Sequence, residues 1–121
     1  MLFDSNVIID YLNGDTEVVN LLRGWKEERR QLSISPITIT EVLALPKLNE
    51  QEIKIAQSFL AEFIVLPLDE TIAQIAAIVC RQYDTKTPDS LIAATAIRYD
   101  MSLVSRDRVF RKIKDLSVIV P

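Results

Sequence analysis

The sequence contains no histidine, one cysteine and two glycines among its 121 residues. The lack of histidine excludes a Ser-His-Asp triad, a histidine general base and a histidine-ligated zinc site. Because Cys80 is the only cysteine, the chain forms neither an intrachain disulfide nor a cysteine zinc site. Gly14 and Gly24 cannot build a Gly-rich phosphate loop or a dinucleotide-binding turn. If the chain is an enzyme, its chemistry must come from carboxylates, lysines, tyrosines or a metal ion held by oxygen atoms.

Long hydrophobic runs and a signal peptide are also missing. The longest apolar runs are too short to span a bilayer, and Met1 to Asp4 lack the basic start and apolar segment of a signal peptide. We therefore expect a cytoplasmic protein that does not enter a membrane. The length and the hydrophobic content of 49% predict a single globular domain over residues 1–121. The net charge of −3 argues against unspecific nucleic-acid binding through a broad basic surface.

Short apolar segments alternate with helical patterns along the whole chain. Strands are predicted at residues 2–3, 32–35, 64–66, 102–104 and 116–120. Helices are predicted at residues 6–12, 15–30, 37–45, 50–63, 70–82 and 88–99, with a short helix or turn at 109–113. This alternation predicts an α/β fold, a three-layer α/β/α sandwich with a mostly parallel sheet of four to five strands. Helices should cover both faces of the sheet through right-handed crossovers.

The stretch from Thr87 to Ala96 predicts a buried, alanine-rich helix with a carboxylate at its start. Thr87 is a candidate N-cap, and Pro88 suits the first helical position, where its missing N–H costs nothing. Asp89 then lies in the first turn, where the helix dipole favours a negative charge. Taken alone, Asp89 is either an acid that stabilises a helix start or one member of a carboxylate site.

Three further acids stand where a parallel sheet would bring them together, because ligands bind at the carboxyl ends of its strands. Asp4 ends the first strand, Glu41 lies on the helix after the second, and Asp107 follows the fourth. Each also has a structural interpretation: a helix cap, a solvated helix residue and an ion-paired turn, respectively. Converging carboxylates need a cation, and Mg²⁺ or Mn²⁺ prefers carboxylate oxygen. One or two such ions would activate a water molecule and neutralise the negative charge on a phosphodiester.

Four segments resemble the successive motifs of PIN domains, and most closely those of VapC-type toxins from toxin–antitoxin pairs. They are Asp4–Ile9, Ser35–Glu41, Pro88–Ala96 and Leu103–Asp107, in the family's order and at compatible spacing. The resemblance implies a parallel sheet with the first strand central and an Mg²⁺- or Mn²⁺-dependent endoribonuclease that hydrolyses RNA. By motif match, the catalytic and metal-binding acids would be Asp4, Glu41, Asp89 and Asp107. Asn6 and Ser105 would hold these carboxylates in place.

The resemblance also implies a small antitoxin that neutralises the protein, and a homodimer. Its fourth motif often carries a further acid two residues after Asp107, where this chain has Val109. We therefore expect one metal ion, held mainly by Asp4, Asp89 and Asp107. The alternative is a degenerate PIN-fold module that binds RNA or protein without cutting. The basic residues near this motif are either RNA-backbone contacts or a solvated face, and they are Arg106, Arg108, Arg111 and Lys112.

Overall fold

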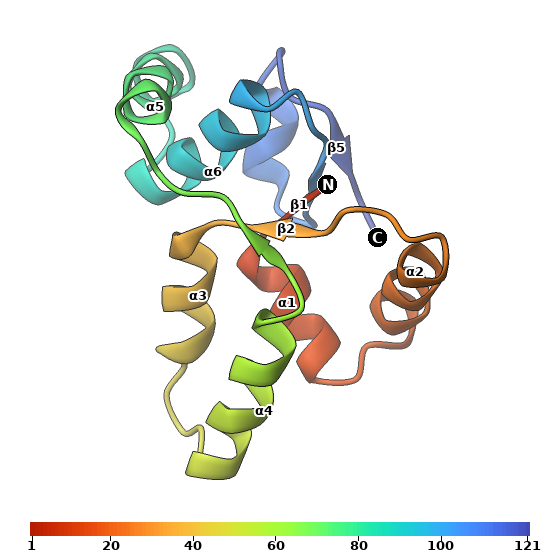
Figure 1. Cartoon of the computed structure of the whole chain (residues 1–121). Helices are drawn as coiled ribbons and strands as arrows, with labels where there is room; N and C mark the ends of the chain where they lie inside the picture. The colour runs from red at the N-terminus through yellow and green to blue at the C-terminus, as the bar shows by residue number, and fades with distance from the viewer.

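The structure, a computed structural model, describes all of residues 1–121. Its five strands form a parallel sheet in the order β3-β2-β1-β4-β5, with β1 at the centre (Figure 1). The strands are β1 (Leu2–Phe3), β2 (Ser33–Ile34), β3 (Ile64–Val65), β4 (Leu103–Val104) and β5 (Val118–Ile119). The predicted α/β fold with a parallel sheet is therefore confirmed.

Six α-helices and one 3₁₀ helix lie between the strands. They are α1 (Ser5–Leu12), α2 (Thr16–Glu27), α3 (Pro36–Leu43), α4 (Glu50–Leu60), α5 (Glu70–Tyr83), α6 (Thr87–Arg98) and η1 (Arg108–Lys112). The predicted ends differ from these by a few residues. For example, α2 ends at Glu27, because Arg29 adopts a left-handed conformation with φ of 57°. No helix is both long and apolar enough to cross a membrane.

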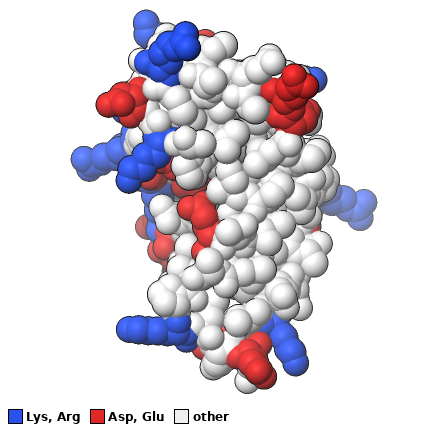
Figure 2. Space-filling view, turned by 90° about the vertical axis from the view of Figure 1, so that its left-hand side faces the viewer, with Lys and Arg blue, Asp and Glu red and all other residues white.

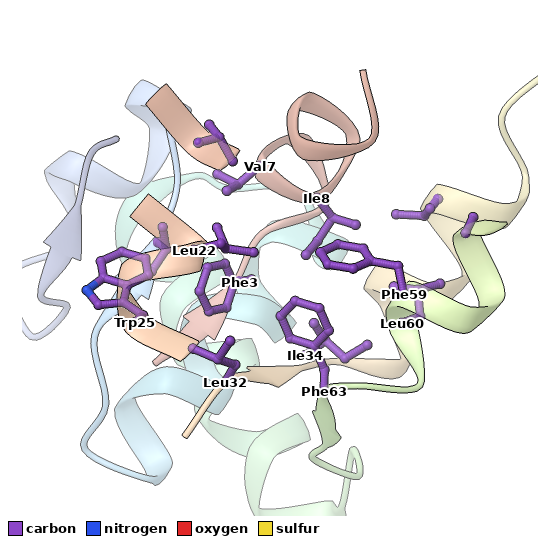
Figure 3. Packing of buried hydrophobic residues seen from close by; sticks show 14 residues of the cluster. Phe3, Val7, Ile8, Leu22, Trp25, Leu32, Ile34, Phe59, Leu60 and Phe63 are labelled. Carbon is purple, nitrogen blue, oxygen red and sulfur yellow. The ribbon is translucent and has the colours of Figure 1, made fainter. Parts of the chain in front are cut away.

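The sheet separates two apolar layers, and neighbouring residues of one strand face opposite layers. Phe3 packs against side chains of α1, α2 and α4, whereas Leu2 packs against α5, α6 and η1. Figure 3 shows Phe3 in the first layer, where its ring meets Trp25 edge-on at 5.8 Å and Phe63 at 5.4 Å between centroids. The strand that leads into Asp4 is thus fixed by packing on both faces.

Helix α6 carries a face of small buried residues that lets it lie close to the sheet and to α5. Ala93, Ala94 and Ala96 are all fully buried, which confirms the predicted alanine-rich helix. The prediction that Thr87 caps this helix is wrong. The helix begins at Thr87, and Lys86 occupies the cap position without a side-chain hydrogen bond. The Ser90 hydroxyl donates to the carbonyl oxygen of Lys86 at 2.9 Å, a contact that satisfies none of the free N–H groups at the helix start.

Candidate active site

The candidate site lies where the order of the strands reverses, between β1 and β4. The chain runs from β1 to β2 on one side, while β4 and β5 lie on the other. A crevice at the carboxyl ends of the strands is expected at such a switch point. Asp4 follows β1 at this edge, and Ser105 to Asp107 follow β4. The topology alone therefore places two of the four predicted acids beside each other.

Asp4 is the buried centre of the site, with 5% of its surface exposed. It caps α1: its Oδ1 accepts a hydrogen bond from the Ser5 N–H at 2.9 Å. Its Oδ2 accepts a second hydrogen bond from the Ser105 hydroxyl at 2.8 Å. Burial raises the pKa of Asp4 to about 6; the two hydrogen bonds oppose this shift, and the charges of Glu41 and Asp89 add to it. Both roles considered for Asp4 hold: it is a helix cap and it belongs to an acidic cluster.

Glu41 lies on α3, exposed, and is linked to Asp4 through Ser5. The Ser5 hydroxyl donates to Glu41 Oε1 at 3.1 Å, while the Ser5 backbone N–H donates to Asp4. Ser5 is itself 6% exposed. Sequence reasoning missed the contact of Ser5 with Glu41. A small polar residue directly after the key acid was the available signal for its second contact.

Asp89 lies in the first turn of α6 and completes the electrostatic cluster. Burial raises its pKa, the charges of Asp107 and Glu41 raise it further, and the charge of Lys86 opposes the shift. The charge of Lys86 thus acts on the site, an influence that sequence reasoning missed. Four acids from separate segments thus influence one another electrostatically at one edge of the sheet. They are Asp4, Glu41, Asp89 and Asp107.

Asp107 is held by a short chain of hydrogen bonds that begins at Asp4. The Ser105 hydroxyl, fully buried, donates to Asp4 and accepts from the Asp107 N–H at 3.0 Å. Asp107 Oδ1 in turn accepts from the Val109 N–H at 3.0 Å and caps η1. The Val109 side chain packs against the apolar layer around α6. Its backbone, but not its side chain, therefore supports the acid.

The remaining predicted residues divide into three kinds. Asn6 is exposed on the first turn of α1 and makes no hydrogen bond to the four acids. Arg108, Arg111 and Lys112 are exposed and form no ion pair. Arg106 does not fit the prediction of an RNA-backbone contact, because its guanidinium is engaged in ion pairs with acids of α1 and α2. Figure 2 shows acidic side chains left of the centre of the face that carries α3 and α5, with lysines and arginines on the adjoining rim.

The donor set fits a hard divalent cation in its chemistry. Asp4, Glu41, Asp89 and Asp107 offer only carboxylate oxygens, the ligands that Mg²⁺ and Mn²⁺ prefer. Burial raises the pKa of Asp4 and Asp89, and a cation would relieve the repulsion from neighbouring carboxylates that adds to this shift. With the side chains as they lie, no three of these groups are close enough to enclose an ion. The ligand roles of the four acids stay predictions.

Comparisons with known proteins agree with this architecture. A chain of a toxin–antitoxin complex from Klebsiella pneumoniae is 29% identical, with a TM-score of 0.83 over 98% of this chain and 94% of that one. FitAcB from Neisseria gonorrhoeae is also 29% identical, with a TM-score of 0.79 over 98% and 95%. VapBC2 from Rickettsia felis, bound to a promoter DNA fragment, shares the fold at 18% identity and a TM-score of 0.87 over 99% and 97%.

No match was found among curated proteins. Residues 1–116 match the family described as PIN domain, which confirms the resemblance found in the four sequence segments. This match spans all four acids and the whole sheet except β5. The chain belongs to the PIN domain family.

Proposed function

We propose that the protein is a divalent-metal-dependent endoribonuclease that acts as the toxin of a toxin–antitoxin pair. One observation carries this proposal: carboxylates from four separate segments of a PIN fold converge around a buried aspartate at one edge of the sheet. Carboxylates that repel one another around a buried member reduce stability, and such arrangements concentrate at functional sites. A purely structural role for all four acids would not require their charges to act on Asp4 and Asp89.

In the proposed site, Asp4, Asp89 and Asp107 hold one ion, and Glu41 is a ligand or orients a water molecule. Bound Mg²⁺ or Mn²⁺ would lower the pKa of a water molecule and neutralise charge on the scissile phosphate. Asp4 must be ionised to serve as a ligand, and its pKa of about 6 means that metal affinity falls in acid. Ser105 and Ser5 fix the orientation of Asp4 and leave its remaining lone pairs for the ion.

The surroundings of the site suit an RNA backbone. Arg108, Arg111 and Lys112 are exposed beside Asp107 and free of ion pairs, so their charges are available to phosphates. Lys86 lies near Asp89 and adds a fourth candidate. A protein of net charge −3 would then bind RNA through this local basic rim rather than through its whole surface.

The toxin role rests on the likeness to a chain of a toxin–antitoxin complex at 29% identity over nearly the whole chain. A small antitoxin would neutralise the enzyme, and both would act in the cytoplasm, with the toxin as a homodimer. Co-expression tests the partner: the gene should arrest growth alone and not together with the antitoxin encoded beside it.

The nuclease is tested with the purified chain, single-stranded RNA and Mn²⁺. Cleavage should occur with the wild type, stop with EDTA, and be lost in Asp4→Asn and Asp89→Asn. Asp115→Asn is the matched control, because it makes the same chemical change at an exposed residue outside the site. Equal cleavage by the wild type and both site variants would refute the proposal, since a contaminating nuclease or a different site would then be responsible.

A binding module without nuclease activity is the second candidate, and Val109 motivates it. The fourth motif of the family often carries a further acid at this position. Here the Val109 side chain packs into an apolar layer instead. Calorimetric titration of Mn²⁺ into the apo protein separates the two functions. Saturable binding of one ion, lost in Asp89→Asn, supports the enzyme; tight binding of RNA or antitoxin without any metal binding supports the module.

A further inference from the structure

Arg106 lies between two residues of the site, Ser105 and Asp107, yet its side chain makes its contacts with other elements. One guanidinium nitrogen, Nη1, contacts Asp10 at 3.0 Å and Asp15 at 2.9 Å. The other, Nη2, contacts Asp15 and Glu17, both at 3.4 Å, and Nε donates to the Pro121 carbonyl oxygen at 3.3 Å. All three nitrogens are therefore engaged. The hydrogen bonds and charges of Asp15 and Asp10 raise the pKa of the Arg106 guanidinium.

The partners of Arg106 are themselves fixed in the fold. Asp10 lies within α1, the helix that Asp4 caps. Asp15 is the N-cap of α2, where its Oδ1 also accepts the Val18 N–H at 3.2 Å. The Arg106 side chain is only 29% exposed. A single exposed ion pair stabilises little, but a guanidinium that bridges two helices holds its backbone in one place.

The loop that Arg106 anchors is the one that carries Ser105 and Asp107. Behind it, the Ser105 N–H bonds the Ile119 carbonyl in β5 at 3.0 Å. Ahead of it, the backbone N–H of Asp107 bonds the Ser105 hydroxyl. Between these two points, Arg106 supplies the side-chain link to α1 and α2. The other side-chain contacts of the loop stay within its own segment or reach Asp4: the Ser105 hydroxyl bonds Asp4 and the Asp107 N–H, and the Val109 N–H bonds the Asp107 carboxylate. Arg106 is thus the loop residue whose side chain ties it to Asp10 and Asp15.

We propose that Arg106 is a positioning residue, whose ion pairs with Asp10 and Asp15 hold the Ser105–Asp107 loop so that Asp107 faces Asp4 and Asp89. The proposal rests on the proposed function for its effect on metal binding, but the loop geometry is tested independently. It also replaces the earlier interpretation of Arg106 as an RNA contact: its charge is neutralised by acids and its donors are occupied.

The experiment compares Arg106→Gln, Arg106→Lys and Asp15→Asn with the wild type and with Lys26→Gln. The last variant breaks another ion pair of α2, with Glu62 at 3.1 Å, and serves as the control. Backbone amide hydrogen exchange of Asp107 and Val109 is measured without metal, and Mn²⁺ affinity is measured by calorimetry. All measurements are made well below the unfolding midpoint of each variant, so that loss of global stability does not enter.

Arg106→Gln should accelerate exchange of both amides and weaken Mn²⁺ binding about tenfold, the usual effect of removing a group that orients a ligand. Arg106→Lys should recover part of the affinity, because it keeps the charge without the two-pronged geometry. Asp15→Asn still caps α2 and should shift both readouts in the same direction. Combined with Arg106→Gln it should add little, because both changes break one link. Lys26→Gln should change neither readout.

Unchanged exchange at Asp107 and Val109 in Arg106→Gln would overturn the proposal, as would faster exchange with unaltered Mn²⁺ affinity in a protein that binds Mn²⁺. The second result would reduce Arg106 to a stabilising contact. A wild type that binds no Mn²⁺ overturns the proposed function instead. Faster exchange in Arg106→Gln would in that case still support the anchoring of the loop.

Discussion

The raised pKa of Asp4 makes the stability of the protein depend on pH in an unusual direction. In the unfolded chain an aspartate ionises near 3.8, whereas burial raises the pKa of Asp4 in the folded protein to about 6. The folded state therefore binds this proton more tightly than the unfolded state does. Its contribution to stability is fully present below about pH 4 and is lost as the pH rises through about 6. Most paired carboxylates act in the opposite direction.

The size of this effect follows from the two pKa values. A tenfold difference in proton affinity is worth about 1.4 kcal/mol, so the shift from 3.8 to about 6 corresponds to about 3 kcal/mol. Because Asp4 is 5% exposed, solvent screening takes little from this value. Asp4→Asn removes the ionisable group and keeps a side-chain oxygen that can accept from the Ser5 N–H. Relative to the wild type, the variant should gain about 3 kcal/mol between about pH 4 and pH 7.

Urea unfolding in EDTA at several pH values measures this difference, because subtracting the wild type cancels the titration of all shared groups. The difference in unfolding free energy should rise with pH, with most of the change between about pH 4 and pH 6. A flat difference would refute the reasoning, since Asp4 would then titrate alike in both states. Adding Mn²⁺ above about pH 6 should stabilise the wild type and not Asp4→Asn.

Three further perturbations test separate parts of the structure. Ser105→Ala removes a hydrogen bond that lowers the pKa of Asp4, so the pH midpoint of Mn²⁺ binding should rise, and urea unfolding should show a loss of about 1–3 kcal/mol. Arg111→Gln should weaken RNA binding and reduce the slope of log affinity against log salt by about 0.7, measured by fluorescence anisotropy. Phe3→Ala should cost about 3–5 kcal/mol in urea unfolding, because Phe3 fills the layer beside Trp25 and Phe63.

The parts of the fold that follow from local patterns could be predicted from the sequence. The apolar pair Leu2–Phe3 and the acid that ends it give both a buried strand and a side chain at its carboxyl end. The Ala-rich stretch of α6 gives a helix that can approach the sheet closely. The convergence of Asp4 and Asp107 needed only one assumption about which strands are neighbours, and the observed order β1-β4 satisfies it.

The hydrogen bonds of Arg106 and Ser5 that sequence reasoning missed join residues far apart along the chain. Arg106 was placed with the basic residues that follow it, because nothing near it in sequence predicts acids 91 and 96 residues away. Likewise, the link from Ser5 to Glu41 joins residues 36 apart. At Thr87 a local rule failed, since α6 begins one residue earlier than predicted, and Lys86 at its cap position makes no side-chain hydrogen bond.

These contacts also explain how one short segment after β4 places a carboxylate near other acids and a guanidinium in ion pairs. Asp107 must stay beside other acids, which repel it, whereas Arg106 attracts acids of its own on α1 and α2. Their side chains make separate contacts: Asp107 acts on Asp89 in the site, and the Arg106 charge is neutralised by its own partners. An arginine that pointed into the site would compete with a metal ion for the same carboxylates. The attraction that fixes the segment is thus kept out of the site, and the acids around Asp4 remain available to a cation.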